Sequence, residues 1–282
     1  MITTIDDARK QSGAGPSANA MLARLARKYS FAAPRPWRLI DDAGGASGSD
    51  ATDGGNGAKG RLKFIPWWLC SGAELDQASV PLFPWRSERR FQELRAIVER
   101  RTIDPVLMCR FACMTDGRTL GLPAILCREF DLLEWLTGRC IASVYASING
   151  AAANVVVRLA GGVLGSVEAA ATLPPGTPMD DRHELIARRG VASDRTVDTQ
   201  VAQSSVYVTT AAGVDRYTDT DDELFGLDPQ QVALVRAGWD ALRHPEEHAA
   251  WRRRHERLAH LVELAVESDR KQQCLAAEGE AS

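Results

Sequence analysis

Residues 123–144 read PAILCREFDLLEWLTGRCIASV, and this stretch is the part of the sequence that indicates the fold most clearly. Its first half predicts a helix that begins near Ala124, and the residues that follow Gly138 predict a strand over about 139–148. The next pair, Asn149 and Gly150, is the favoured sequence for a two-residue type I′ turn. The sequence therefore predicts an antiparallel meander of three strands, over 139–148, 153–160 and 163–173.

Segments on both sides of this stretch extend the same plan. A helix is predicted over 88–101, because its apolar residues recur on one side of a helix. The other predicted elements are strands at 105–114, 183–189, 197–202, 205–210 and 213–217 and helices at 229–242 and 246–272. The predicted fold class is α+β, with an open, mostly antiparallel sheet and helices on one face.

The order and spacing of these elements resemble those of a known protein family. Aligned on Asp131, Trp135 and Gly138, the opening stretch resembles a motif of the Gfo/Idh/MocA oxidoreductases, which reads Asp-x-Gly-x-His-x-x-Asp and then continues to a Trp and a Gly. Further matches bring the resemblance to most of residues 84–272; they lie at 85–111, 155–176 and 251–273. The resemblance implies the open-sheet fold of that family's C-terminal substrate domain.

Two positions depart from the family motif. The family's first Asp and its His lie beside the nicotinamide and the substrate, and they fall here on Ala124 and Arg128. Alanine has no ionisable group, and a guanidinium with a pKa above about 12 cannot release a proton near neutrality. We therefore expect no catalytic residue of the family type and no dehydrogenase activity from the isolated chain.

The front of the chain lacks the dinucleotide-binding signature. Family members begin with a Rossmann domain, which carries a Gly-x-Gly-x-x-Gly turn after its first strand. Here no apolar run precedes the glycine-containing stretches at 13–20 and 44–60. We expect neither a Rossmann domain nor a bound cofactor, NAD(H) and NADP(H) included. The predicted organisation is a flexible segment at 1–60 with a short helix at 18–29, the sheet domain at 61–275 and a disordered tail at 276–282.

Three residues are candidates for a ligand pocket. They are Arg128, which replaces the family's His, Arg110, a possible second cation, and Asp131, a candidate base for which Glu129 is the alternative. A guanidinium offers a planar donor fork that matches a carboxylate or phosphate, so the pocket would favour a small anion. In the alternative, Arg128 forms an ion pair with Glu129, Asp131 or another acid, and its role is structural: it fills the space that the family's His would occupy.

Composition excludes several classes of protein. The net charge of -3 and pI near 6.0 argue against a nucleic-acid-binding face. No apolar run reaches the roughly 18 to 20 residues of a membrane span, and no signal-peptide core begins the chain, so the predicted location is cytoplasmic.

The cysteines and two short motifs predict no metal site. The six cysteines form no Cys-x-x-Cys pair; Cys109 and Cys113 are expected in the core, and Cys127 is the one to test for reactivity because it precedes a cation. The sequence HPEEH at 244–248 matches an inverted zincin pattern, but a solvated helix start explains it better. The acidic run at 219–223 is read as an exposed turn.

Three functional classes follow from these observations. The first is a non-catalytic interaction or small-molecule-binding module with this fold. The second is the accessory subunit of a split NAD(P)-dependent oxidoreductase, with a separate Rossmann-bearing chain. The third is a repurposed enzyme that uses Arg128 to hold an anionic substrate. The small side chains of Val167, Ala169 and Ala171 predict a sheet face that packs in a homodimer, or in a heterodimer with a related dehydrogenase.

Overall fold

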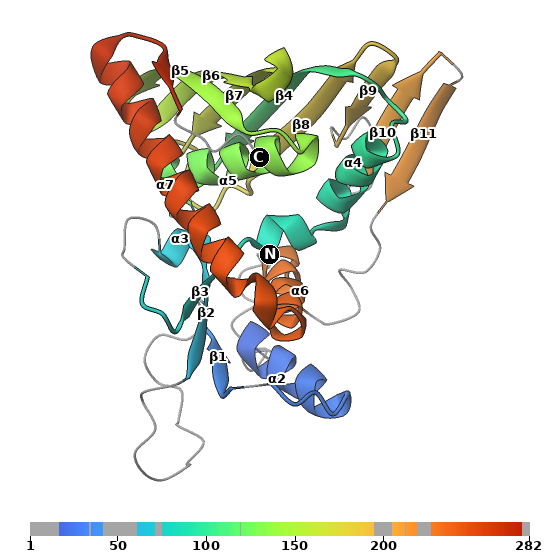
Figure 1. The fold of residues 1–282 in the computed structure, drawn as a ribbon, viewed down its shortest axis with the longest axis vertical. Coiled ribbons are helices and arrows are strands. Elements are labelled where there is room, and N and C mark those ends of the chain that lie inside the picture. The colour runs from blue at the N-terminus through green and yellow to red at the C-terminus, as the bar shows by residue number, and fades with distance from the viewer. Residues whose placement is uncertain are drawn as a thin grey trace, which may run out of the picture.

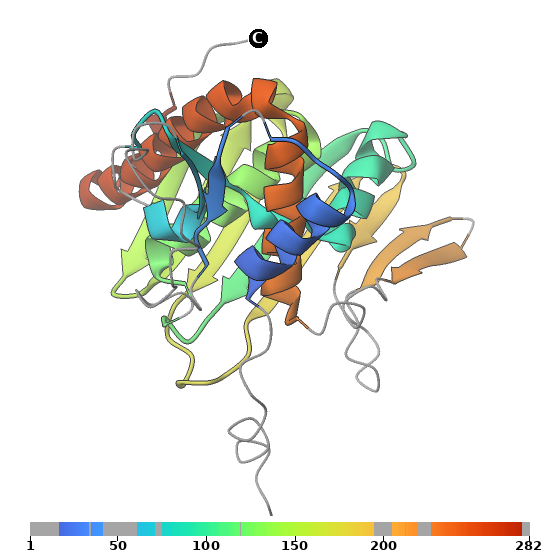
Figure 2. The same ribbon diagram turned by 90° about the horizontal axis from the view of Figure 1, so that it is seen from below.

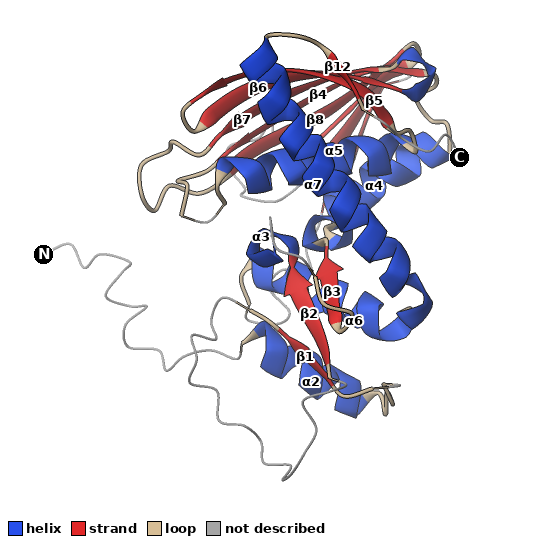
Figure 3. Cartoon of the chain, turned by 60° about the vertical axis from the view of Figure 1, so that its left-hand side comes forward, coloured by secondary structure: helices blue, strands red, loops and turns tan. Residues whose placement is uncertain are grey.

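Two sheets organise the part of the chain that the structure describes (Figure 1). The structure is a computed structural model, and it describes residues 17–33, 35–41, 61–70, 75–118, 120–194, 205–211, 213–218 and 227–277. The larger sheet has nine strands and the smaller has three. Between and beside them run the helices, which lie on one side of the larger sheet (Figure 3).

The nine-stranded sheet has the strand order β11-β10-β9-β8-β4-β7-β6-β5-β12. All of its neighbouring strands pair antiparallel except β4 and β7, which are parallel. The strands are β4 (Val106–Met114), β5 (Ile141–Asn149), β6 (Ala152–Leu159), β7 (Leu164–Ala170), β8 (Asp180–Ala187), β9 (Gly190–Ser193), β10 (Ser205–Thr210), β11 (Gly213–Thr218) and β12 (Leu275–Ala276). The predicted fold class and meander are confirmed, while the strand candidate at 197–202 lies outside the described residues.

Helices cover one face of this sheet. They are α4 (Arg89–Glu99), α5 (Leu122–Thr137) and α7 (His248–Lys271). Three short helical turns connect other elements: η1 (Pro84–Ser87) precedes α4, η2 (Ala160–Gly162) joins β6 to β7, and η4 (Pro245–Glu247) precedes α7. Burial alternates along the strands, so that every second side chain packs into the core beneath the helices. The other face of the sheet carries no helix among the described residues (Figure 2).

A second α/β unit precedes and underlies the large sheet. Its strands β1 (Trp37–Leu39), β2 (Leu62–Pro66) and β3 (Ser79–Leu82) pair in parallel, with α3 (Trp67–Cys70) after β2. The helices α2 (Ala18–Lys28) and α6 (Pro229–Arg243) close a separate apolar core with these strands. The predicted short helix at 18–29 is present, but the expectation of a C-terminal sheet domain alone was incomplete, because strand β1 pairs with β2.

Packing of α2 on α6 depends on one small residue. Helix α6 begins at Pro229, after the Asp228 side chain accepts a hydrogen bond from the backbone of Gln231. A Cβ at Gly238 would lie 2.5 Å from Cδ2 of Leu22 in α2, so a larger residue there would force the Leu22 side chain to move. Helix α2, from the front of the chain, thereby packs against α6, from near its end.

The small-residue face of β7 points the opposite way from the prediction. Val167 and Ala169 are buried beneath α5, whereas Ser166 and Glu168 lie on the open face. A Cβ at Gly165 would meet Leu133 of α5 at 3.3 Å. The small side chains therefore admit a helix of the same chain instead of a second sheet, and they cannot form the dimer contact predicted for them.

The turn between β5 and β6 also differs by one residue from the prediction. Asn149 pairs with Ala152, which leaves Gly150 and Ala151 as the two turn residues. Gly150 has φ 60°, and Ala151 has no positive φ. A glycine at the first central position is typical of a type II′ turn, not the type I′ turn that was expected.

Candidate functional site

Helix α5 carries the residues that the family motif would place at a reaction site. The helix lies between the large sheet and helices α4 and α7, and its side chains are buried on nearly every side. Four of those buried side chains are charged: Arg128, Glu129, Asp131 and Glu134. Ionised groups in such a position require partners, since burying an unpaired charge is very costly.

Arg128 has its partners within the protein. Its side chain is 3% exposed, its Nη1 donates to Glu129 at 2.5 Å, and its Nη2 contacts Asp181 of β8. The guanidinium also lies over the ring of Phe91, 5.3 Å from the centroid. The positive charge at the position of the family's His is thus neutralised by two carboxylates, which agrees with the pairing alternative for this residue.

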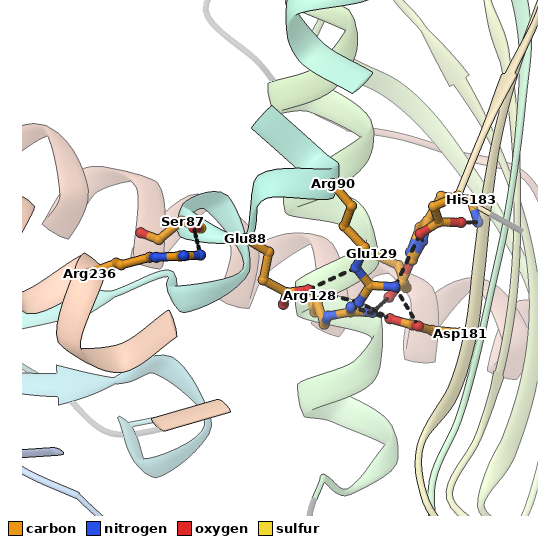
Figure 4. Close-up of polar contacts among 9 residues, drawn as sticks. Ser87, Glu88, Arg90, Arg128, Glu129, Asp181, His183 and Arg236 are labelled. Carbon is orange, nitrogen blue, oxygen red and sulfur yellow. Dashed lines mark hydrogen bonds and ion pairs between the residues drawn. The ribbon is translucent and has the colours of Figure 1, made fainter. Parts of the chain in front are cut away.

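His183 extends this pairing into the sheet (Figure 4). Its Nε2 lies 2.9 Å from Glu129 and its Nδ1 lies 2.7 Å from Asp194. Burial acts to lower the pKa of His183, but the carboxylates of Asp194 and Glu129 outweigh it and raise the pKa to about 9. The imidazole is therefore protonated at neutral pH and donates from both ring nitrogens.

Arg90 of α4 completes the group. It donates from both terminal nitrogens to Asp181 at 2.7 Å, from Nη1 to Asp194 at 3.2 Å and from Nε to Glu88 at 2.8 Å. We name this group the α5–β8 charge cluster; its members are Glu88, Arg90, Arg128, Glu129, Asp181, His183 and Asp194. Three cations face four carboxylates in it, so it has no surplus positive charge with which to bind an anion.

Asp131 belongs to a different network, whose other members come from η1 and α7. Its carboxylate accepts from Trp85 Nε1 at 2.7 Å, from Arg86 Nε at 2.7 Å and from Arg254 Nε at 2.7 Å. Burial acts to raise the pKa of Asp131, yet Arg86 and Arg254 outweigh it and hold that pKa well below its usual range. A carboxylate held in this way is a poor general base, contrary to the role considered for it.

Arg110, the third pocket candidate, lies on the opposite face of the sheet. Its side chain is 61% exposed and pairs with Glu184 at 3.4 Å. On β4 the residues that face the helices are Cys109, Phe111 and Cys113. The structure therefore does not bring Arg110, Arg128 and Asp131 into one pocket.

A small cavity adjoins Arg128. It has a volume of about 40 Å³ and is lined by Trp68, Trp85, Glu88, Leu120, Arg128 and Met179, among others. It lies beyond the carboxyl ends of β2 and β3, where open parallel sheets bind ligands. Ligand pockets typically have roughly 300–1,000 Å³, so this cavity has room for a few waters and none for a dinucleotide.

The cysteines and histidines show no metal-binding arrangement in the described part of the chain. No group of three or more potential metal ligands occurs among the described residues. His248 Nε2 donates to the carbonyl of Ala241, and His244 pairs with Glu246. Cys109, Cys113 and Cys127 are all buried, which confirms the core positions of the first two and leaves the thiol of the third inaccessible. The acidic run at 219–223 lies outside the described residues.

Five members of the charge cluster were not identified from the sequence: Glu88, Arg90, Asp181, His183 and Asp194. The available signal was the sequence DDRHELIA of β8, in which Asp181 and His183 alternate on the side that faces the helices. A charged residue at a buried strand position indicates a partner across the core. The partner's identity follows only from the packing of α4 and α5 on β8.

Comparison with known proteins identifies the fold. No known family profile and no curated protein matches the sequence. The structure is similar to an oxidoreductase from Agrobacterium radiobacter solved with NAD+, L-tartaric acid and magnesium (14% identity, 77% of this chain, 73% of that chain, TM-score 0.62). It is also similar to an oxidoreductase domain protein from Kribbella flavida (15%, 78%, 74%, 0.59) and to levoglucosan dehydrogenase (14%, 78%, 75%, 0.61).

These structural neighbours are oxidoreductases of the Gfo/Idh/MocA type, so the chain has the fold that the resemblance implied. Identities this low establish the fold and not the activity. Among the described helices, none is long and apolar enough to cross a membrane.

Proposed function

We propose that this chain is a non-catalytic protein with the Gfo/Idh/MocA fold and that it acts as an interaction module. One observation carries the proposal: the residue at the position of the family's His, Arg128, is buried and paired with Glu129 and Asp181. Neither it nor Ala124 can exchange a proton with a substrate. The site has become part of the structural core.

The small parallel sheet supports the same proposal. Dinucleotides bind beyond the carboxyl ends of such strands, at a helix N-terminus reached through a glycine turn. Here the short helix Trp67–Cys70 follows β2 directly, and Pro84 and Trp85 follow β3 almost at once. Large side chains, Trp67 and Trp68 after β2 and Trp85 after β3, therefore follow both strands.

The first prediction concerns the nicotinamide cofactor. Titration of the full chain with NADH or NADPH should leave the nicotinamide fluorescence unchanged, with an NADH-dependent dehydrogenase run in parallel as the positive control. Saturable binding at micromolar concentration, followed by turnover of any polyol or sugar, would overturn the non-catalytic assignment.

The open face of the large sheet is the proposed interaction surface. Tyr145, Val156 and Leu164 are 41%, 47% and 42% exposed on adjacent strands, and Tyr145 pairs directly with Val156. Charges of both signs lie beside them on the same face: Arg110, Glu168, Arg182 and Glu184. An isologous dimer can place each charge against its opposite, because a two-fold axis brings the same surface of both copies together.

The second prediction tests this surface. Val156→Arg should convert the dimer to a monomer in light scattering, because it places two unpaired charges near the centre of the contact. The matched control is Val266→Arg, which alters an equally exposed valine on α7, away from the sheet. If the wild-type protein is a monomer that binds a Gfo/Idh/MocA dehydrogenase through this face, its partner is a different protein and not a second copy. A wild-type monomer that forms no contact through this face contradicts the proposal.

A further inference from the structure

A larger cavity lies away from Arg128, where four helices meet. It has a volume of about 230 Å³, and its lining residues come from β3, η1, α4, α5, α6 and α7. In Figure 1 these helices surround the short η1 segment that follows β3. The volume is near the lower end of the roughly 300–1,000 Å³ of ligand pockets, which suits a small molecule.

One part of the cavity is apolar and aromatic. Phe83, Trp135 and Trp251 line it together with Leu82 and Ala237. Trp135 and Trp251 are only half-buried, so part of their ring surface faces the cavity and not the core. This part can accept a hydrocarbon side chain.

A second part presents cations and hydrogen-bond donors. Arg95 uses Nε for Glu99, and its guanidinium carbon lies 4.7 Å from the Trp135 ring centroid. Arg86 uses Nε and Nη2 for Asp131. Both arginines line the cavity, and Ser87 and Gln92 line it with them. Such a set of donors matches a carboxylate.

The residues that line the cavity include a single acid. Asp240 of α6 lines the cavity, and within the described residues no hydrogen bond or ion pair engages its carboxylate. Asp240 is exposed to solvent, and together with the guanidiniums of Arg95 and Arg86, which also pair with Glu99 and Asp131, it gives the cavity groups of both signs. An ammonium group can pair with the carboxylate of Asp240, and a carboxylate group can pair with the guanidiniums of Arg95 and Arg86.

We propose that this cavity binds a small zwitterion, namely a free α-amino acid with an apolar side chain. Its carboxylate would lie toward Arg95 and Arg86, its ammonium toward Asp240, and its side chain among the aromatic residues. An anion without an ammonium group would be repelled by Asp240, and an amine without a carboxylate would be repelled by the two guanidiniums. The site is separate from the former reaction site, so it does not depend on the non-catalytic assignment.

The test uses L-leucine and its two single-charge analogues, 4-methylpentanoate and 3-methylbutylamine. Calorimetric titration of the full chain should show saturable binding of L-leucine, and each analogue should bind at least about tenfold more weakly, the equivalent of about 1.4 kcal/mol. Tryptophan fluorescence should change with the same midpoint, because Trp135 and Trp251 line the cavity.

Variants assign the binding to this cavity. Arg95→Ala and Asp240→Asn should each weaken L-leucine binding at least about tenfold, with unchanged circular dichroism. Arg100→Ala, at the end of α4 and outside the cavity lining, is the matched control and should bind normally. Equal affinity for leucine and either analogue, or no saturation by L-leucine or L-phenylalanine up to about 10 mM, would overturn the proposal.

Discussion

Asp131→Asn is expected to lower the free energy of unfolding by roughly 3–5 kcal/mol, the range found when one partner of a buried ion pair is removed. The Asp131 carboxylate is fully buried and accepts from Trp85, Arg86 and Arg254. It therefore connects η1, α5 and α7. Removal of its charge leaves the Arg86 guanidinium without its counter-ion and leaves Arg254 with Glu134 alone, while the amide can accept at only one oxygen.

Urea denaturation of the full chain measures this effect. The matched control is Asp180→Asn, which removes a carboxylate from an exposed pair with Arg182 at 2.8 Å. Exposed ion pairs contribute little, so this variant should change the stability by less than about 1 kcal/mol. Equal effects of the two substitutions would show that the Asp131 network does not hold these helices together.

The second large effect is a loss of stability as the pH rises. The pKa of His183 is about 9 in the folded chain and 6.5 is its ordinary value. Below pH 6.5 the imidazole is protonated in both states, and its stabilisation is complete. As the pH rises toward 9, the unfolded chain loses this proton while the folded chain retains it, so the free energy of unfolding should fall by roughly 3 kcal/mol.

Denaturation at several pH values across that window tests the assignment to His183. The variant His183→Gln should be less stable than wild type below pH 6.5, because Glu129 and Asp194 lose a buried cation between them. It should also show a much shallower fall as the pH rises. An equally steep fall in the variant would assign the pH dependence to other groups.

Local patterns in the sequence were enough to predict most secondary structure. The helix over 88–101, the meander from 139 onward and the helix over 229–242 all occur within a few residues of the expected positions. Such elements depend on apolar periodicity and turn residues, which act over a few positions of the chain. The motif around Asp131, Trp135 and Gly138 likewise indicated the fold before its structure was known.

The site could be predicted only in part. Ala124 and Arg128 showed that the family's proton-transfer groups are absent, because that conclusion depends on side-chain chemistry alone. Glu129 was among the expected partners of Arg128, but Asp181 was not readable: it lies 53 positions along the chain, and Arg90 reaches the same carboxylate across 91 positions. Pairing at that separation is decided by how helices pack on a sheet.

Tertiary structure also decided which face of β7 is buried and where the front of the chain packs. Period-two alternation divides β7 into two faces but does not say which one a helix covers; Leu133 of α5 decides it by lying on Gly165. Similarly, β1 is too short to be recognised by pattern, and it is ordered by pairing with β2 and by the shared core with α6.

The sequence by itself determined the secondary-structure elements and the lost proton-transfer chemistry, because both depend on residues close together in the chain. Long-range packing determined the buried faces, the charge partners and the cavity, because each requires segments that are distant in the chain to meet.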